Sequence, residues 1–162
     1  MNHWIWIAII VIIVYYISYY YRYPKEVSIL QTSLADFSFD ILLQKQPIVI
    51  AEQVQDWNTL KDAWFPSNKI DMYQEKSTEE LWRRNRYKYI LLQPYQDCEI
   101  LLNPANRKMN SDNTPDENDT LLAIRLKPFQ IVIVPFHWYF LVPSNIQYGW
   151  MGVHDWITRF IG

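Results

Sequence analysis

The chain has few of the residues that small proteins use for cross-links and metal sites. It contains one cysteine, Cys98, three histidines and three glycines among 162 residues. A single cysteine excludes an intrachain disulfide and a cysteine-based zinc site, and it agrees with a reducing compartment. Cys98 lies in the apolar run CEILL, where we expect a small buried thiol rather than a nucleophile. The net charge of −2 argues against a general nucleic-acid binder, so no nucleic-acid partner is expected.

The first 23 residues lack charge almost entirely. No charged side chain and no proline occurs from Trp4 to Tyr21. As a helix this run would be about 27 Å long, close to the roughly 30 Å hydrocarbon thickness of a bilayer. Tryptophans at one end and tyrosines at the other are typical of membrane interfaces. A cleaved signal peptide is disfavoured because a basic start and a small-residue cleavage site are missing, and a soluble core helix because the run is long. We expect residues 1–23 to be a transmembrane anchor, which contacts the membrane through residues 4–21.

Basic residues follow this run but do not precede it. Arg22 and Lys25 come after it, whereas the start has only the α-amino group and His3. The positive-inside rule then predicts a single-pass membrane protein with its globular part in the cytosol. Asn118 begins an Asn-Asp-Thr sequon, which would be glycosylated only if the topology were reversed.

The remaining residues predict one α+β domain that is mainly β. We expect residues 24–33 to be a juxtamembrane connector and residues 34–162 to be one globular domain with a single core. Short β-rich runs separated by Pro and Asn favour antiparallel hairpins. The polar run 110–119 is expected to be a solvated loop, because it lacks the glycine and spacing of a calcium loop. Strands are predicted at 47–51, 87–93, 98–102, 121–126, 129–134 and 138–142. Helices are predicted at 38–45 after Ser38, at 56–64 after Asp56, from Ser77 in a capping box with Glu80, and at 152–161.

Two parts of the sequence resemble cupin-like Jumonji-C domains. The PIVI strand at 47–50, followed by Asp56-Trp57 and a tryptophan-containing helix, resembles the start of such a domain. The segment LKPFQIVIVPFHWY at 126–139 resembles the L-x-P-G-D-x-x-x-I-P-x-x-W-W-H hairpin of that family. The tail GVHDWITRFI resembles the end of short cupin-like proteins of large DNA viruses. The resemblance covers residues 34–66 and 120–161. It implies a small antiparallel, barrel-like double-stranded β-helix, and it extends the expected location to a virion or host membrane.

Active members of that family are iron- and 2-oxoglutarate-dependent oxygenases, but their ligands are missing. The chain has no H-x-D or H-x-E motif, and the expected second histidine falls on Phe140. Phe129-Gln130 replaces the glycine-aspartate turn. Weak candidates for a site with two histidines and one carboxylate are His137, His154 and Asp155. The simpler role for His137 is as a packed or turn residue. The simpler role for Asp155 is at the start of a closing helix, where a carboxylate interacts favourably with the helix dipole. We therefore expect no catalytic residue, no metal and no cofactor.

One basic run stands out beside aromatic residues. It contains Arg83, Arg84, Arg86 and Lys88. The simplest interpretation is a solvated helix end, where cations are favourable. The second is a patch on the membrane surface, because anionic headgroups attract basic residues by about 1 kcal/mol each. Contact with nucleic acid is the third.

The sequence predicts a membrane-anchored, non-catalytic binding or structural module with a degenerate cupin-like fold. Eight tryptophans and twelve tyrosines exceed what a small core needs. Because aromatic residues are frequent at interfaces, a protein partner is expected, and a small-molecule substrate is not. The alternatives are a divergent metal-dependent oxygenase, which the shortage of ligands disfavours, and a carbohydrate-binding cupin in which aromatic rings stack on sugars.

Overall fold

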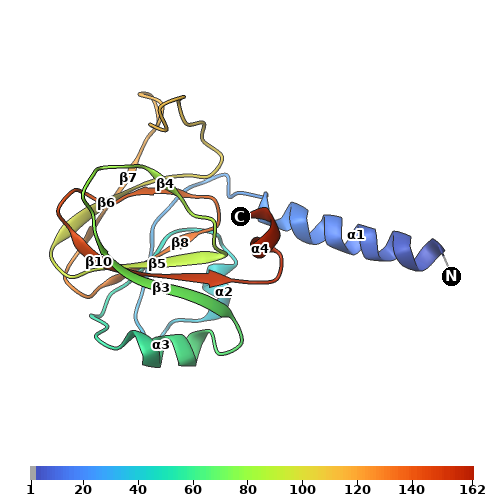
Figure 1. The fold of residues 1–162 in the computed structure, drawn as a ribbon, viewed down its shortest axis with the longest axis horizontal. Coiled ribbons are helices and arrows are strands. Elements are labelled where there is room, and N and C mark those ends of the chain that lie inside the picture. Colours follow the sequence, from blue (N-terminus) through green and yellow to red (C-terminus); the bar gives the residue numbers. More distant parts are fainter. Residues whose placement is uncertain (1–2) are drawn as a thin grey trace.

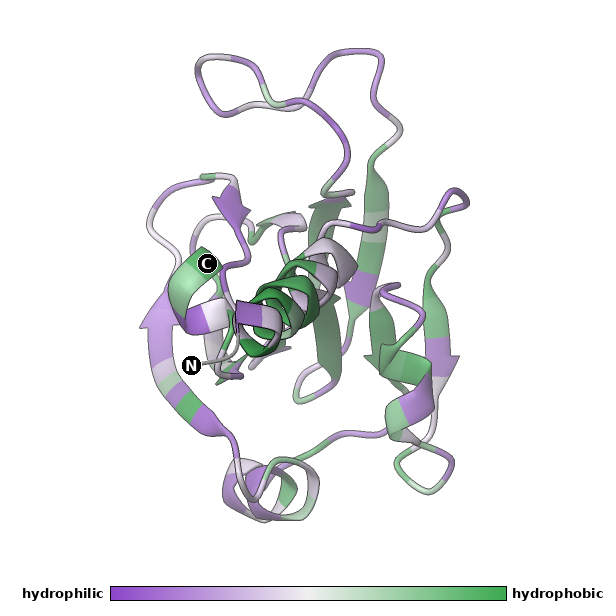
Figure 2. Cartoon of the chain, turned by 90° about the vertical axis from the view of Figure 1, so that its right-hand side faces the viewer, coloured by the Kyte–Doolittle hydropathy of each residue, from purple (hydrophilic) through white to green (hydrophobic). Residues whose placement is uncertain are grey.

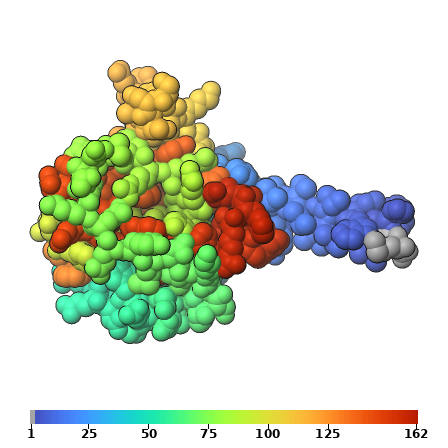
Figure 3. Space-filling model, in the orientation of Figure 1, coloured from blue at the N-terminus to red at the C-terminus, as the bar shows by residue number. Residues whose placement is uncertain are grey.

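The computed structural model describes residues 3–162 as one projecting helix and one β-rich body. Helix α1 (His3–Tyr20) extends away from the body, as Figures 1 and 3 show. Its length and composition allow it to cross a membrane, although a soluble core helix or a signal sequence can meet the same criteria. Nearly all of its side chains are exposed, so it contributes little to the core of the body.

The body consists of two β-sheets. The first sheet has six strands in the order β1-β2-β8-β5-β10-β3, and the second has four in the order β4-β9-β6-β7. Neighbouring strands are antiparallel, apart from the parallel pair β1 and β2. The strands are β1 (Leu30–Thr32), β2 (Ile48–Ile50), β3 (Lys69–Lys76), β4 (Arg83–Arg84), β5 (Tyr89–Pro94), β6 (Cys98–Asn103), β7 (Leu122–Leu126), β8 (Ile131–Pro135), β9 (Tyr139–Leu141) and β10 (Gln147–His154). The remaining helices are α2 (Phe39–Leu42), α3 (Trp57–Trp64) and α4 (Thr158–Ile161).

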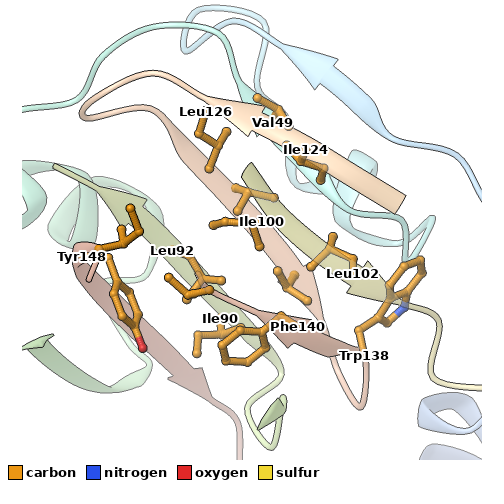
Figure 4. Packing of buried hydrophobic residues seen from close by; sticks show 14 residues of the cluster. Val49, Ile90, Leu92, Ile100, Leu102, Ile124, Leu126, Trp138, Phe140 and Tyr148 are labelled. Atoms are coloured by element: carbon orange, nitrogen blue, oxygen red, sulfur yellow. The ribbon is translucent and has the colours of Figure 1, made fainter. Parts of the chain in front are cut away.

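The main core lies between the two sheets. Leu92 and Tyr148 of the six-stranded sheet and Leu102 of the four-stranded sheet belong to one buried cluster, which Trp138 completes. Figure 4 shows these side chains pointing into the space between the strands. Burying an apolar side chain of this size stabilises the fold by about 1.5–3 kcal/mol, so this cluster is a principal source of stability.

A second core covers the outer face of the six-stranded sheet. Met151 and Val153 of β10 pack there with Leu60 of α3 and Leu42 of α2. Successive side chains of a strand point to opposite faces, so β10 can serve both cores. The central strands of the six-stranded sheet are therefore buried on both faces, which explains why β2, β5 and β8 are nearly continuous apolar runs.

Most of the predicted elements are confirmed. The strands predicted at 47–51, 87–93, 98–102, 121–126, 129–134 and 138–142 correspond to β2, β5, β6, β7, β8 and β9. The helix predicted at 56–64 is α3, where the Asp56 carboxylate accepts hydrogen bonds from the backbone N–H groups of Asn58 (2.9 Å) and Thr59 (3.3 Å). The helix predicted at 38–45 is only four residues long as α2, and the Ser38 side chain makes no capping hydrogen bond.

Two predicted helices are wrong. No helix starts at Ser77, whose hydroxyl donates to the carbonyl oxygen of Glu79 at 3.1 Å. The tail predicted as a helix at 152–161 is helical only in α4, because residues 152–154 belong to β10. Strand β10 is hydrogen-bonded to β3 on one side and to β5 on the other, and this double ladder overrides the helical spacing of the apolar residues. The segment predicted as a connector contains β1, so the sheet begins before residue 34.

The turn between β7 and β8 holds Phe129 in an unusual conformation. Its φ is 65°, in the left-handed region that favours glycine. The side-chain oxygen of Gln130 accepts a hydrogen bond from the backbone N–H of Lys127 at 2.9 Å. Phe129-Gln130 therefore forms a backbone turn at the place where the Jumonji-C pattern that the sequence resembles has glycine and aspartate.

Candidate functional site

Helix α1 is joined to the domain by a packed cluster at its C-terminal end. Tyr20 is buried and packs with Phe136 and Ile157. The rings of Tyr20 and Phe136 meet edge to face, with centroids 5.3 Å apart. The Tyr20 hydroxyl donates a hydrogen bond to the Asp155 carboxylate. We call Tyr20, Phe136, Asp155 and Ile157 the joint, because they connect α1 to the segment that precedes α4.

Lys45 binds the end of α1 from another direction. Its ammonium group donates to the carbonyl oxygen of Tyr19 and, at 2.8 Å, to that of Arg22. It also lies 4.0 Å from the centroid of the Tyr19 ring. A cation at this position satisfies carbonyl groups that a helix end leaves free. Burial, together with Arg22, lowers the pKa of Lys45 to about 8, so the ammonium form still predominates at neutral pH.

Asp155 connects the joint to α4 and to the basic run. Its carboxylate accepts hydrogen bonds from the backbone N–H groups of Ile157 (3.1 Å) and Thr158 (2.8 Å) and lies 3.8 Å from the Lys88 ammonium. Burial alone would raise the pKa of Asp155, but the Thr158 backbone, the Tyr20 hydroxyl and Lys88 together lower it below its usual value. This contribution to stability is therefore present at neutral pH and is lost as the pH falls through that lowered pKa.

The structure divides the basic run into two parts. Arg83 and Arg84 form β4, which pairs with β9, so the solvated helix end expected from the sequence is wrong. Arg86 is exposed just beyond this strand. Lys88 instead faces Asp155 and belongs to the surroundings of the joint.

Asn85 fixes the position of the arginines. Its side chain is 1% exposed, and its amide donates to the carbonyl oxygens of Val134 (2.9 Å) and Pro135 (2.8 Å). Its side-chain oxygen accepts from the backbone N–H of Tyr87 at 2.9 Å. These bonds attach the basic run to the end of β8.

A pocket of about 390 Å³ lies between the edge strands β3 and β4. Four arginines line it, and the fourth, Arg159, comes from α4. Tyr87 and Trp150 add aromatic surface, with ring centroids 5.5 Å apart. Gly152 makes room for Tyr87, since a Cβ atom there would lie 2.4 Å from the tyrosine ring. The sequence revealed three of the arginines but gave no signal for Arg159.

The histidines have separate partners. His154 lies at the pocket, where its Nε2 is 3.0 Å from the Asp71 carboxylate and its buried Nδ1 has no hydrogen-bond partner among residues 3–162. His137 is buried, stacks on Phe136 and lies 3.3 Å from the Tyr23 hydroxyl through Nδ1. Burial, and then the charge of Arg84, lower the pKa of His137 to about 4, so it is neutral at physiological pH.

The three residues considered as metal ligands, His137, His154 and Asp155, each have a different hydrogen-bond partner. His137 is hydrogen-bonded to Tyr23, His154 to Asp71, and Asp155 to Tyr20. Within residues 3–162 no group of three or more His, Cys, Asp or Glu side chains is placed to hold a metal ion.

The thiol of Cys98 is only partly buried, at the start of β6. Burial and then the neighbouring Asp97 raise its pKa to about 11. This leaves little of the thiolate that nucleophilic or metal-binding chemistry needs at neutral pH.

No protein-family profile and no curated protein sequence matches the chain. Among solved structures it is similar to RmlC from Streptococcus suis, solved in complex with dTDP-D-xylose, at 10% identity and a TM-score of 0.32. The similarity covers 62% of this chain and 54% of that chain, so the match spans about half of RmlC. It concerns the fold alone. The chain is a mainly β member of the α+β class, with two largely antiparallel sheets and one apolar N-terminal helix.

Proposed function

We propose that the chain is a single-pass membrane protein whose β domain is a non-catalytic binding module held at a fixed angle to the bilayer. The joint is the observation that carries this proposal. A flexible linker would let the domain move freely, whereas here the helix end is buried against the domain and hydrogen-bonded to Asp155 and Lys45. The anchor and the domain therefore act as one unit.

The surroundings of the joint support a position at the membrane surface. Trp156 and Phe160 are 57% and 84% exposed although both are large and apolar. The Trp156 ring lies 6.1 Å from that of Tyr16 on α1. Figure 2 looks along the apolar helix and shows α4 and the C-terminus beside it. Aromatic side chains at this level of a membrane helix are suited to the interface between headgroups and hydrocarbon.

The proposal also includes the type of domain: the β domain is a degenerate cupin-like domain that lacks the iron and 2-oxoglutarate site. The alternative, a divergent oxygenase, would require ligands that the described residues do not bring together. A protein partner stays part of the proposal because exposed aromatic surface also occurs away from the joint, at Tyr73 of β3.

Alkaline extraction of membranes from cells with a secretory pathway tests both the anchor and its orientation. We expect the full chain to stay in the membrane pellet at high pH, with residues 1–23 still present in its intact mass. Asn118 is exposed, so it would be accessible for glycosylation if the domain reached the lumen. We expect it to stay unmodified. Release of the chain by alkali, or removal of its first residues, would contradict the anchor, and a glycan on Asn118 would contradict the cytosolic side.

A further inference from the structure

The pocket between β3 and β4 lies where the two sheets leave a gap at their edges. β3 ends the six-stranded sheet and β4 ends the four-stranded sheet, so neither has a further strand on this side. Ile90 of β5 and Trp150 of β10 line the pocket from the core, and Arg159 and Gly162 line it from the C-terminus. Segments that are far apart in the sequence thus converge on one open cavity.

Positive charge dominates this cavity. Of its four arginines, Arg83 is paired with Glu75 and lies 3.0 Å from the Tyr148 hydroxyl. Within residues 3–162, Arg84, Arg86 and Arg159 have no carboxylate within ion-pair distance, and all three are exposed. The acidic residue of the lining, Asp71, is already bonded to His154. Three guanidinium groups without an ion-pair partner among the described residues therefore line this space, together with Asp71 and Gly162, the last residue of the sequence. One of them, that of Arg84, also lies 5.7 Å from the centroid of the Tyr139 ring.

The shape of the guanidinium group indicates what would compensate this charge. Its planar arrangement of N–H donors matches phosphate oxygens in pairs, and arginine is the usual residue for phosphate recognition. The aromatic surface of Trp150 and Tyr87 stands beside these donors. Inorganic phosphate alone would leave that surface uncovered, whereas a phosphate carried on an organic group would cover it.

We propose that this pocket binds the phosphate monoester group of an organic ligand. Arg84, Arg86 and Arg159 hold the phosphate, and Trp150 with Tyr87 contacts the organic part. Asn85 is a positioning residue, because its buried hydrogen bonds hold the chain between Arg84 and Arg86.

The position of α4 decides which sources can supply such a ligand. Arg159 belongs to the short helix that packs beside the end of α1, at the end of the domain from which the anchor leaves (Figure 1). If α1 spans a bilayer, as proposed above, the pocket opens close to the headgroups. The phosphate then comes either from a lipid with a monoester headgroup or from a soluble organic phosphate.

Two binding arms separate these sources. In the first, phenyl phosphate is titrated by calorimetry into the full chain in neutral detergent, which needs no bilayer. In the second, the full chain is placed in phosphatidylcholine nanodiscs with or without phosphatidic acid, and amide exchange of residues 83–87 and 158–162 is followed. We expect saturable binding of one phosphate per chain in the first arm, slower exchange caused by phosphatidic acid in the second, or both.

A charge-matched pair of variants makes the test specific. The pocket variant is Arg84→Gln with Arg86→Gln and Arg159→Gln, and it should lower the affinity, or the exchange protection, at least tenfold. The control removes the same charge at the exposed Lys108, Arg125 and Lys127, away from the pocket, and should bind like the wild type.

Binding in the first arm only identifies a soluble ligand, and protection in the second arm only identifies a lipid. No binding in either arm, or an equal loss in the control variant, overturns the pocket proposal. Failure of the membrane proposal would be recognised by a different result: the chain would not elute with the nanodiscs, while phenyl phosphate binding in detergent could still be measured.

Discussion

Replacing both Ile10 and Ile13 with arginine is expected to release the chain from membranes. Both side chains are exposed in the middle of α1 and contact no part of the described domain core. One arginine at the centre of a spanning helix costs about 2.5–3.5 kcal/mol of insertion free energy. Two would cost about 5–7 kcal/mol, which is more than a thousandfold in the partition between membrane and water. Sedimentation of membranes after expression, followed by quantification of the chain in both fractions, measures this effect.

The matched control is the Ile10→Leu and Ile13→Leu variant, which should stay in the membrane like the wild type. The released arginine variant should keep the β-rich circular dichroism spectrum of the domain, since neither position belongs to a core. An arginine variant that remains fully in the membrane fraction would show that residues 4–21 do not lie in hydrocarbon.

Replacing Asn85 with leucine is expected to lower the free energy of unfolding by about 3 kcal/mol. Leucine has nearly the same size but removes the amide that donates to the carbonyls of Val134 and Pro135 and the oxygen that accepts from the N–H of Tyr87. The Pro135 carbonyl then keeps only the backbone N–H of Trp138, at 3.3 Å. A buried polar group that loses its hydrogen bond costs about 1–3 kcal/mol. Thermal unfolding of the full chain in detergent should therefore show a transition lower by roughly 6–12 °C.

Asn58→Leu provides the control, because Asn58 is exposed on α3 and its side chain makes no hydrogen bond within residues 3–162. Its transition should stay close to that of the wild type. Equal shifts in the two variants would mean that Asn85 does not fix the basic run to β8.

The sequence predicted the strands that form apolar runs, but it did not predict three of the four edge strands, β1, β3 and β4, or the glycine-containing β10. β3 carries charged and polar residues and is mostly exposed, so it does not look like a strand without its partner β10. β10 contains Gly149 and Gly152, which are unfavourable in strands. The structure explains both glycines. A Cβ atom at position 149 would lie 2.6 Å from the Tyr95 hydroxyl, and one at position 152 would lie 2.4 Å from the Tyr87 ring.

The site was predicted only where its residues are close in sequence. Arg83, Arg84 and Arg86 are visible as one run, whereas Arg159 joins them only through the path of β10 and α4. The hydrogen bond from Tyr20 to Asp155 joins residues 135 positions apart. Such contacts depend on the strand order, which local propensity and spacing do not determine.

The most direct test of the account measures how deeply the α4 end of the domain lies in a bilayer. Spin labels at Phe160→Cys and, separately, at Gln96→Cys are introduced into the full chain with Cys98→Ser and reconstituted in nanodiscs. Gln96 follows β5 at the end of the ladder where Pro94 pairs with Tyr148, whereas Phe160 lies beyond the opposite end of β10. If the joint seats the domain on the membrane, the label at 160 will be relaxed mainly by oxygen and the label at 96 mainly by an aqueous nickel complex. Equal relaxation of both labels by nickel would contradict the account.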